Sequence, residues 1–351
     1  MENFQIFTYY FEYRGLSIRT QNSEMRMSRE EKYVGDLVSA NGSNDPNISR
    51  RRSIGIGALS QIFSVLNEIS YGHQYIEIGL VLRESTLLSK MLLSAESWHR
   101  LYQYQIEKLE EVDLMFFKQL FSSHSKTGTE FYYSETGTIP MRIQISVKRL
   151  LYWRQILKSS KSEMLNRVYN AQTISPVHGD WVNLLKQDKV DFEIKISDEE
   201  VEALSEQKFK SYVKQKSVDL AIKYLEKLKK SHSKSYQLNI RDMCISPYLL
   251  DDRFLKEDRE MLFRLRSKTI SVKQNFPNAY MNNDMLCDLC NLFTCTQEHP
   301  LQCPALAGSL VVDKSVKHIW KYRGTAGLCN FFSTFLEPQR ETFKGKGLIN
   351  Q

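Results

Sequence analysis

Four cysteines and one histidine stand close together near the end of the chain, in LCDLCNLFTCTQEHPLQCP, residues 286–304. Two pairs are spaced as Cys287-x2-Cys290-x8-His299-x3-Cys303. A tight turn brings two nearby sulfurs to one ion, and a His and a Cys four residues apart share one face of a helical turn. Thiolates combined with one imidazole select zinc over magnesium or calcium. We therefore predict a Zn²⁺ site, structural rather than catalytic, because four protein ligands leave no open position for water.

Cys295 lies inside the loop between the two pairs. It could replace one ligand, but its position breaks the pairing of the other four residues, so we expect Cys295 to be a bystander. The alternative is that all of these cysteines are reduced thiols of a flexible tail that binds no metal. A closed site would instead tie down a segment that is too short to hold a core of its own.

The chain has 351 residues and six cysteines, of which five stand at or after Cys287. So few cysteines do not make a disulfide scaffold, and they fit metal binding in a reducing compartment. The first residues lack the basic and apolar segments of a signal peptide. The most apolar stretch, residues 76–95, carries Arg83, Glu84 and Lys90, which a membrane span would have to bury. We therefore expect an intracellular protein, nuclear or cytoplasmic, with no membrane partner and no small-molecule substrate.

Positive charge is concentrated in one part of the chain. The formal net charge is +7, which permits contact with nucleic acid without requiring it. Residues 186–206 hold eight acids and three bases, whereas residues 208–234 hold nine lysines against two acids. A merely solvated helix face usually mixes the two signs, so this separation favours a surface that contacts phosphates. The candidate phosphate-contacting residues are Lys208, Lys210, Lys214, Lys216, Lys223, Lys227, Lys229, Lys230, Arg264, Arg266 and Lys268.

Apolar periodicity predicts a mainly α protein with little strand after residue 45. Residues 17–27 and 31–42 suggest two short strands or a hairpin, and the Asp45-Pro46 pair then starts a helix. Residues 122–140 carry turn chemistry and are predicted to form a loop that could hold one short helix. Further helices are predicted at 74–95, 103–121 and 144–159, after Asp180, from a Ser197–Glu200 capping box, and at 208–230 and 257–272.

Two of these helices have clear inward faces. In the helix at 103–121, the residues expected to be buried are Ile106, Leu109, Val112, Phe116 and Leu120. In the helix at 208–230, they are Phe209, Val213, Leu220, Tyr224 and Leu228. The helix that starts at Asp45 contains Gly55 and Gly57, which weakens the expectation of an unbroken rod.

Several stretches, taken in order, resemble the region downstream of the polymerase palm in non-LTR (LINE-type, jockey-like) retrotransposon reverse transcriptases. The resemblance covers roughly residues 18–305 and implies a helical thumb, a basic connector and a CCHC zinc segment that helps to hold RNA template or target DNA. It rests on EKYVGDLVSANGSNDPNISRRRSIGIGALSQI, IEIGLVLRESTLLSKMLLSAESWHRL, IEKLEEVDLMFFKQLF, SETGTIPMRIQISVKRLLYWRQIL, PVHGDWV, LFRLRSKTISVKQNF and LCDLCNLFTCTQEHPLQCP.

The resemblance departs from the family at its catalytic centre. A reverse transcriptase needs palm aspartates that hold the metal ions of polymerisation. The only Asp-Asp pair here is Asp251-Asp252, which we expect to lie at a helix N-terminus, facing the dipole. The resemblance therefore implies a fragment without its catalytic residues, and we expect no polymerase activity from this chain alone.

The resemblance implies a fold for the chain and a division of the chain into five segments. That fold is mainly α: a thumb-like helical bundle with a short N-terminal β remnant and a small C-terminal CCHC zinc segment. The segments are a β remnant at 1–45, a thumb-like domain at 46–180, a basic connector at 181–280, the zinc segment at 281–305 and a tail at 306–351.

Three functions compete. The first is a non-catalytic remnant that binds RNA or DNA electrostatically, with low sequence specificity, and in which Phe293 could stack on a base or simply fill a tiny core. The second is a helical, zinc-containing interaction or scaffold protein, in which the acids at 186–206 pair with the lysines. The third is an enzyme using Ser175 and His178–Asp180, but a lone His in a turn more often caps or donates a hydrogen bond.

Overall fold

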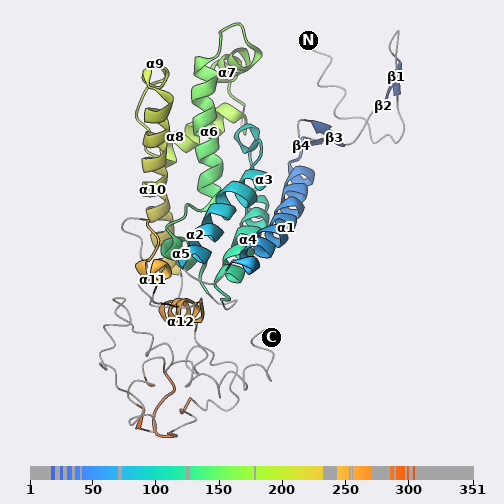
Figure 1. The fold of residues 1–351 in the computed structure, drawn as a ribbon. Helices are drawn as coiled ribbons and strands as arrows, with labels where there is room; N and C mark the ends of the chain where they lie inside the picture. Colours follow the sequence, from blue (N-terminus) through green and yellow to red (C-terminus); the bar gives the residue numbers. More distant parts are fainter. Residues whose placement is uncertain are drawn as a thin grey trace. The chain divides into compact units, whose positions relative to one another are not determined.

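The structure is a computed structural model, shown in Figure 1. The residues that it describes are 17–19, 24–26, 30–33, 36–39, 42–69, 73–123, 127–177, 179–231, 243–252, 254, 256–269, 285–287, 290–296, 299 and 303–304. The predicted tail at 306–351 and His178 lie outside them.

Short hairpins come first along the described chain. Strand β1 (Ser17–Arg19) pairs antiparallel with β2 (Glu24–Arg26), and β3 (Glu30–Tyr33) pairs antiparallel with β4 (Asp36–Ser39). Each pair forms its own two-stranded sheet. Everything larger in the described residues is helical, which confirms the predicted mainly α class with short N-terminal strands.

The structure contains the predicted helices in order, together with helices at 164–174 and 247–250 that were not predicted, and it divides the predicted helix at 74–95 into shorter segments. Their bounds are α1 (Asp45–Glu68), α2 (His73–Leu82), η1 (Arg83–Leu88), α3 (Ser89–Met91), η2 (Ala95–Ser97), α4 (Gln103–Leu120), α5 (Thr129–Thr136), α6 (Met141–Lys158), α7 (Met164–Ile174), α8 (Trp181–Asp191), α9 (Asp198–Ala203), α10 (Glu206–Ser231), α11 (Pro247–Leu250) and α12 (Lys256–Arg266). Within the described ranges, no helix is long and apolar enough to cross a membrane.

Two compact units interleave along the sequence. Their ranges are Met1–Gln61, Glu84–Asp113 and Met141–Ser217 for the first unit, and Ile62–Arg83, Leu114–Pro140 and Val218–Gln351 for the second. Each unit therefore draws on three separate stretches of chain. The segment boundaries expected at 46, 181 and 281 stay predictions.

In the first unit, α6 is the helix against which η2, α7, α8 and α9 pack. Arg149 of α6 donates to Asp188 of α8 at 2.6 Å, and both side chains are buried. Trp153 of α6 meets Phe209 of α10 edge to face, with ring centroids 5.9 Å apart. The ammonium of Lys189 lies 3.5 Å from the centroid of the Trp153 ring. These contacts place the start of α10 against α6. The lysines farther along α10 are positioned by the remainder of that helix.

Helix α1 is unbroken over 24 residues despite its glycines. A Cβ on Gly55 would lie 2.6 Å from Sδ of Met91, so at this position the missing side chain lets two helical segments approach closely. At Gly57 a Cβ would meet nothing within 4 Å. The expectation that these glycines would interrupt the helix is therefore wrong, because packing at Gly55 offsets the low helix propensity of glycine.

In the second unit, α5 is buried along its whole length. Its aromatic residues join rings of α4 and α12: Phe117 stacks on Tyr132 at 5.7 Å, and Phe121 stacks on Phe263 at 4.3 Å. Phe131 meets Phe263 edge to face at 5.0 Å. The short helix that the sequence analysis allowed within 122–140 is present as the eight-residue α5. Its burial was not predicted, because three consecutive aromatics show no helical apolar spacing.

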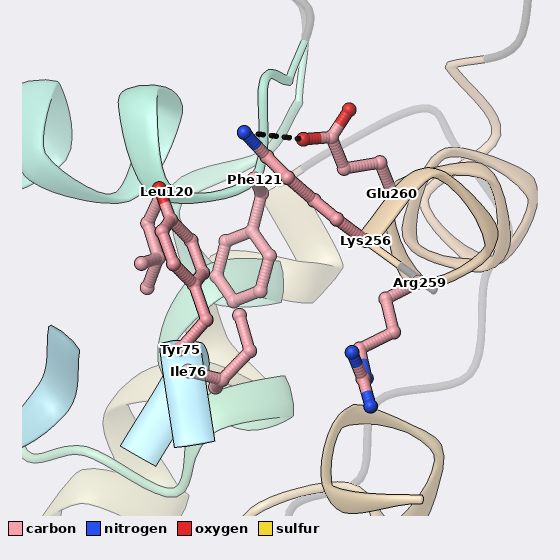
Figure 2. A pocket seen from close by; sticks show the side chains of 7 residues that line it. All are labelled: Tyr75, Ile76, Leu120, Phe121, Lys256, Arg259 and Glu260. Atoms are coloured by element: carbon pink, nitrogen blue, oxygen red, sulfur yellow. Dashed lines mark ion pairs between the residues drawn. The ribbon is translucent and has the colours of Figure 1, made fainter. Parts of the chain in front are cut away.

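Helix α12 packs on α2 and the end of α4 around a small apolar recess, shown in Figure 2. Lys256 lies 5.2 Å from the Tyr75 ring centroid and 3.8 Å from Glu260, whose carboxylate accepts from Ser122 at 2.7 Å. The recess has a volume of about 10 Å³, at most the space of one water. It is a packing seam and not a ligand site.

Helix α10 buries Phe209 and Val213 as predicted, but from there on its buried residues differ from the predicted ones. The buried residues recur every fourth position, at Phe209, Val213, Ser217, Ala221 and Leu225. The expected Leu220, Tyr224 and Leu228 are only half-buried. Ser217 and Ala221 are small, and small residues give no apolar signal in a sequence.

The Asp251-Asp252 pair does not start a helix. Asp251 follows the last residue of the short α11, which has Pro247 at its first position, and α12 begins only at Lys256. The backbone carbonyl of Asp251 accepts from the guanidinium of Arg259 at 2.7 Å. The pair is therefore part of a connection between two helices, and the expectation of a helix N-terminal pair is wrong.

Candidate metal centre and basic surfaces

The Cys287, Cys290, His299 and Cys303 side chains meet at one point. One ligand atom from each lies within 4.8 Å of the others. Cys287, Cys303 and His299 are buried and Cys290 is half-buried. Sγ of Cys290 lies 3.3 Å from Nε2 of His299. This arrangement could hold a metal ion through three sulfurs and one nitrogen.

A tight reversal of the chain brings the first two cysteines together. The amide of Cys287 donates to the carbonyl of Phe293 at 2.8 Å, and the amide of Cys295 donates to the carbonyl of Met285 at 2.7 Å. Asn291 donates its amide to the carbonyl of Cys287 at 2.8 Å and has a φ of +52°, in the left-handed region that Asn tolerates. The turn therefore forms through backbone hydrogen bonds.

The protonation states favour metal binding. Desolvation acts to raise the pKa of the Cys290 thiol, but hydrogen bonds from the backbone at Leu292 and Phe293 and from neighbouring thiols lower it below its ordinary value. Burial lowers the pKa of His299, so the imidazole is neutral at pH 7. A metal needs thiolate sulfur and neutral imidazole, and both shifts move in that direction.

Cys295 is buried beside the cluster but is not among the four residues whose ligand atoms converge. None of the five cysteines in the described ranges is in a disulfide. Phe293 is 54% exposed, and its ring centroid lies 5.8 Å from that of His299. A ring this open does not fill a core, so of the two roles considered for Phe293, filling a tiny core is wrong.

The lysines of α10 mostly face solvent. Lys216, Lys223, Lys227 and Lys230 follow one another at intervals that keep them on one side of the helix. Six of the eight predicted lysines are exposed: Lys208, Lys210, Lys214, Lys223, Lys227 and Lys230. The other two are half-buried: Lys216 and Lys229. Lys210 forms an ion pair with Glu206 at 2.5 Å within α10.

The predicted cations of α12 behave differently. Arg266 donates from Nε and Nη2 to both carboxylate oxygens of buried Glu135, at 3.0 and 2.8 Å. Burial acts to lower the pKa of Arg266, but the charge of Glu135 outweighs it and raises that pKa. Arg264 donates to the carbonyl of Ser122 at 2.6 Å. Arg266 therefore neutralises a buried carboxylate in the core of its unit, and its assignment as a phosphate contact is corrected.

Lys268 lies just after α12, at a turn where its φ is +52° and its residue is half-buried. The structure thus separates the eleven predicted cations into a mostly exposed set on α10 and a half-buried set in and just after α12, of which Arg264 and Arg266 donate hydrogen bonds within the fold. Sequence reasoning missed this division because Glu135, the partner of Arg266, is distant in the chain and lies in the segment predicted as loop.

No protein-family model, curated protein or solved structure matches this chain.

Proposed function

We propose that this chain binds single-stranded RNA or DNA electrostatically through α10 and that a structural Zn²⁺ ion closes its C-terminal loop. The observation that carries the proposal is the row of Lys216, Lys223, Lys227 and Lys230 on one side of a 26-residue helix. A row of cations can contact successive phosphates of a strand without reading its sequence. A protein with this role works inside the cell, in the nucleus or cytoplasm.

The origin that accounts best for these parts is a non-LTR retrotransposon reverse transcriptase, of which this chain would be the portion after the palm. The ordered motifs support that origin, and the mainly helical fold and Cys/His segment are compatible with it. From this chain alone we expect no polymerase activity. Primer extension on a primed RNA template with Mg²⁺ and deoxynucleotides should give no product.

Salt-dependent RNA binding tests the electrostatic role. We expect log K for a single-stranded 20-mer to fall linearly with log salt, with a slope of about 0.7 for each phosphate contacted. Replacing Lys216, Lys223, Lys227 and Lys230 together by Gln should reduce the magnitude of that slope by up to about 3.

A matched control removes the same charge elsewhere. Lys158, Lys161, Lys186 and Lys195 are all exposed and lie outside α10. Replacing these four by Gln should change the slope far less than the α10 variant does. If both variants lose affinity equally, only net charge matters and α10 is not the binding surface. If the natural protein does not bind RNA at low salt, the proposed nucleic-acid role is wrong.

Zinc is the metal that best suits three thiolates and one imidazole, because soft sulfur ligands disfavour magnesium and calcium. Four protein ligands close the coordination shell, so the ion would stabilise the loop and would not activate water. Purified protein should contain one zinc per chain by mass spectrometry. Replacement by Co²⁺ should give the intense visible bands of a tetrahedral ion together with thiolate-to-metal charge transfer.

Cysteine variants distinguish ligands from the bystander. Cys287→Ser should lose most of the bound metal, whereas Cys295→Ser, also at a buried cysteine, should retain it. Cys244→Ser, at an exposed cysteine, controls for the loss of any thiol. Loss of metal from the Cys295 variant alone would show that Cys295 is a ligand and that one of the four is not.

The competing role as an interaction scaffold has one observation in its favour. Helix α7 exposes Met164, Leu165, Val168 and Ile174, the last 84% exposed. Such a face suits a protein partner as well as solvent. Val168→Glu should leave RNA affinity unchanged if nucleic-acid binding is the function, whereas loss of a stable co-purifying protein partner would favour the scaffold.

A further inference from the structure

Two tyrosines at the start of α4 are stacked on one another and exposed. Tyr102 is 60% exposed and Tyr104 is 44% exposed. Their ring planes differ by 11° and their centroids are 5.9 Å apart. The core face of α4 is formed by other residues, such as Leu109 and Phe116. The two tyrosine rings are therefore not part of the core face of this helix. Large exposed aromatic surfaces mark interaction sites.

Hydrogen bonds fix this aromatic pair in place. The hydroxyl of Tyr104 donates to both carboxylate oxygens of Asp45, at 2.8 and 2.7 Å. Asp45 also accepts from Gln105 at 3.0 Å, and Gln105 in turn accepts from the amide of Tyr102 at 2.9 Å. This network of hydrogen bonds joins the start of α1 to the start of α4. A platform held in this way loses little conformational entropy when a ligand stacks on it.

Cations accompany the pair. The ammonium of Lys108 lies 5.2 Å from the centroid of the Tyr104 ring, and Arg100, two residues before Tyr102, is exposed. Two carboxylates lie near the same rings: Asp45 accepts from Tyr104, and Glu107 accepts from Gln103 at 2.8 Å. Hydrogen bonds from neutral groups do not cancel the charge of a carboxylate, so the affinity of this surface for a strand would come from stacking of a base on Tyr102 and not from local positive charge.

A cavity of about 440 Å³ is built from the segments that carry this platform. Its wall includes Asn44, which precedes Asp45, together with Asn47, Trp98 and His99. The volume falls in the range of small-molecule sites, roughly 300–1,000 Å³. Asp36, which forms an ion pair with Arg51, also lines this cavity, and neither Tyr102 nor Tyr104 does. The amide side chains and the rings supply the mixture of hydrogen-bonding and apolar surface that a base requires.

We propose that Tyr102, stacked on Tyr104, is the stacking platform of a subsite for an unpaired nucleotide of single-stranded RNA or DNA. The inference rests on the proposed function and adds to it a contact with a base, which α10 does not provide. A proline-rich peptide is the competing occupant, but such peptides bind in grooves between separated rings. Here the rings lie against each other, so a flat base stacked on the outer ring fits better.

The experiment uses the full chain and two labelled 12-mers at constant salt, one of oligouridylate and one of abasic ribose phosphate. Tyr102→Ala should weaken binding of the first about tenfold, because one stacked base is lost, and leave the abasic strand unchanged. Tyr102→Phe retains the ring and should bind like the natural protein. A second titration of oligouridylate over a range of salt concentrations should give the same slope for the natural protein and both variants, since no phosphate contact changes.

The outcomes separate this subsite from the proposed function. If the natural protein binds RNA and Tyr102→Ala binds it equally well, the subsite is wrong and the α10 role stands. If Tyr102→Ala loses affinity for both strands alike, the effect is structural and overturns the subsite. If no RNA binds at low salt but a decaproline peptide does, both proposals fail and the platform is a peptide site. Met115→Ala, at another exposed side chain of α4, is the control for loss of surface.

Discussion

Gly137 ends α5 at a point where no side chain fits. Its φ is +63°, and its amide donates to the carbonyl of Tyr133. A Cβ at this position would lie 2.5 Å from the backbone oxygen of Met243. Both the left-handed conformation and the close approach require glycine, because the contacted atom is backbone and has little freedom to move.

We expect Gly137→Ala to lower the free energy of unfolding by roughly 2–5 kcal/mol, from left-handed strain and the clash together. Urea unfolding followed by circular dichroism measures the change. Gly57→Ala is the matched control, since that glycine is helical with open space around its Cβ position, and should stabilise by about 0.5–1 kcal/mol. Equal effects at the two sites would show that the Met243 contact does not constrain the fold.

The Glu135–Arg266 pair is the second decisive feature at this scale. Glu135 is fully buried, and the guanidinium of Arg266 donates hydrogen bonds to both of its carboxylate oxygens. Tyr248 lies beside it, with the guanidinium carbon of Arg266 5.4 Å from the centroid of its ring. Removing one partner of such a pair leaves an uncompensated charge in the core, whereas removing both does not.

Glu135→Leu alone should therefore cost about 3–5 kcal/mol, and the double variant Glu135→Leu with Arg266→Met should cost clearly less than the sum of the singles. A double-mutant cycle from urea unfolding measures the coupling. The double variant, which leaves neither charge unpaired, should keep the salt slope of RNA binding because Arg266 is engaged by Glu135. Strict additivity would mean that the two side chains do not interact.

At the scale of elements, α9 begins with the capping box that its sequence indicates. The hydroxyl of Ser197 accepts from the amide of Glu200 at 3.2 Å, and the Glu200 carboxylate accepts from the amide of Ser197 at 2.7 Å. The helix has only six residues. So short a helix has little intrinsic stability, and its cap is a large part of what sets its start.

Ser197→Ala should cost about 1 kcal/mol, and Ser197→Asp, which can also accept from the helix amides, should retain most of that stability. Thermal unfolding of the three proteins compares them. A cost as large for Asp as for Ala would indicate that the side chain acts through packing and not as a cap.

The elements also show which signals a sequence carries. The Ser197 cap, the Asp180 cap of α8 and the buried face of α4 were predictable, because each depends on residues within a few positions of one another. The burial of α5 was not, since it depends on rings such as Phe263 that arrive from far along the chain. The i+4 stripe of α10 was hidden because two of its members are Ser217 and Ala221.

The candidate metal centre was the opposite case. Its ligand set follows from spacing within seventeen residues, Cys287 to Cys303, so that a local pattern was enough to name all four residues that converge. The stacked tyrosines gave no such signal, because Tyr102 and Tyr104 are ordinary residues until the Asp45 carboxylate is known to hold them. Sites built by distant contacts need the structure.

At the scale of the whole molecule, several tyrosines resist ionisation. Burial raises the pKa of Tyr132 and of Tyr169, where a hydrogen bond to Asp198 raises it further. Burial and the charge of Glu135 raise the pKa of Tyr248. An unfolded tyrosine ionises near pH 10. The folded state keeps these protons to higher pH, so stability is unaffected below about pH 9 and falls as the pH rises above 10.

We expect alkaline unfolding in which tyrosinate absorbance and loss of helical circular dichroism occur together for this group, while exposed tyrosines titrate first. Tyr169→Phe removes one such proton and should move the midpoint to higher pH. If all 18 tyrosines titrate near pH 10 with the helical signal unchanged, the buried groups are not linked to folding.

The interleaving of the two units has a consequence for protein synthesis. Phe121 and Phe263 stack in the finished core, yet at bacterial or eukaryotic elongation speeds the ribosome releases the first on the order of ten seconds before the second. During that interval the aromatic rings of α4 and α5 lack their partner. Nascent chains stalled before residue 256 should therefore recruit chaperones and be cleaved readily by protease, and those extended beyond the α12 codons should not.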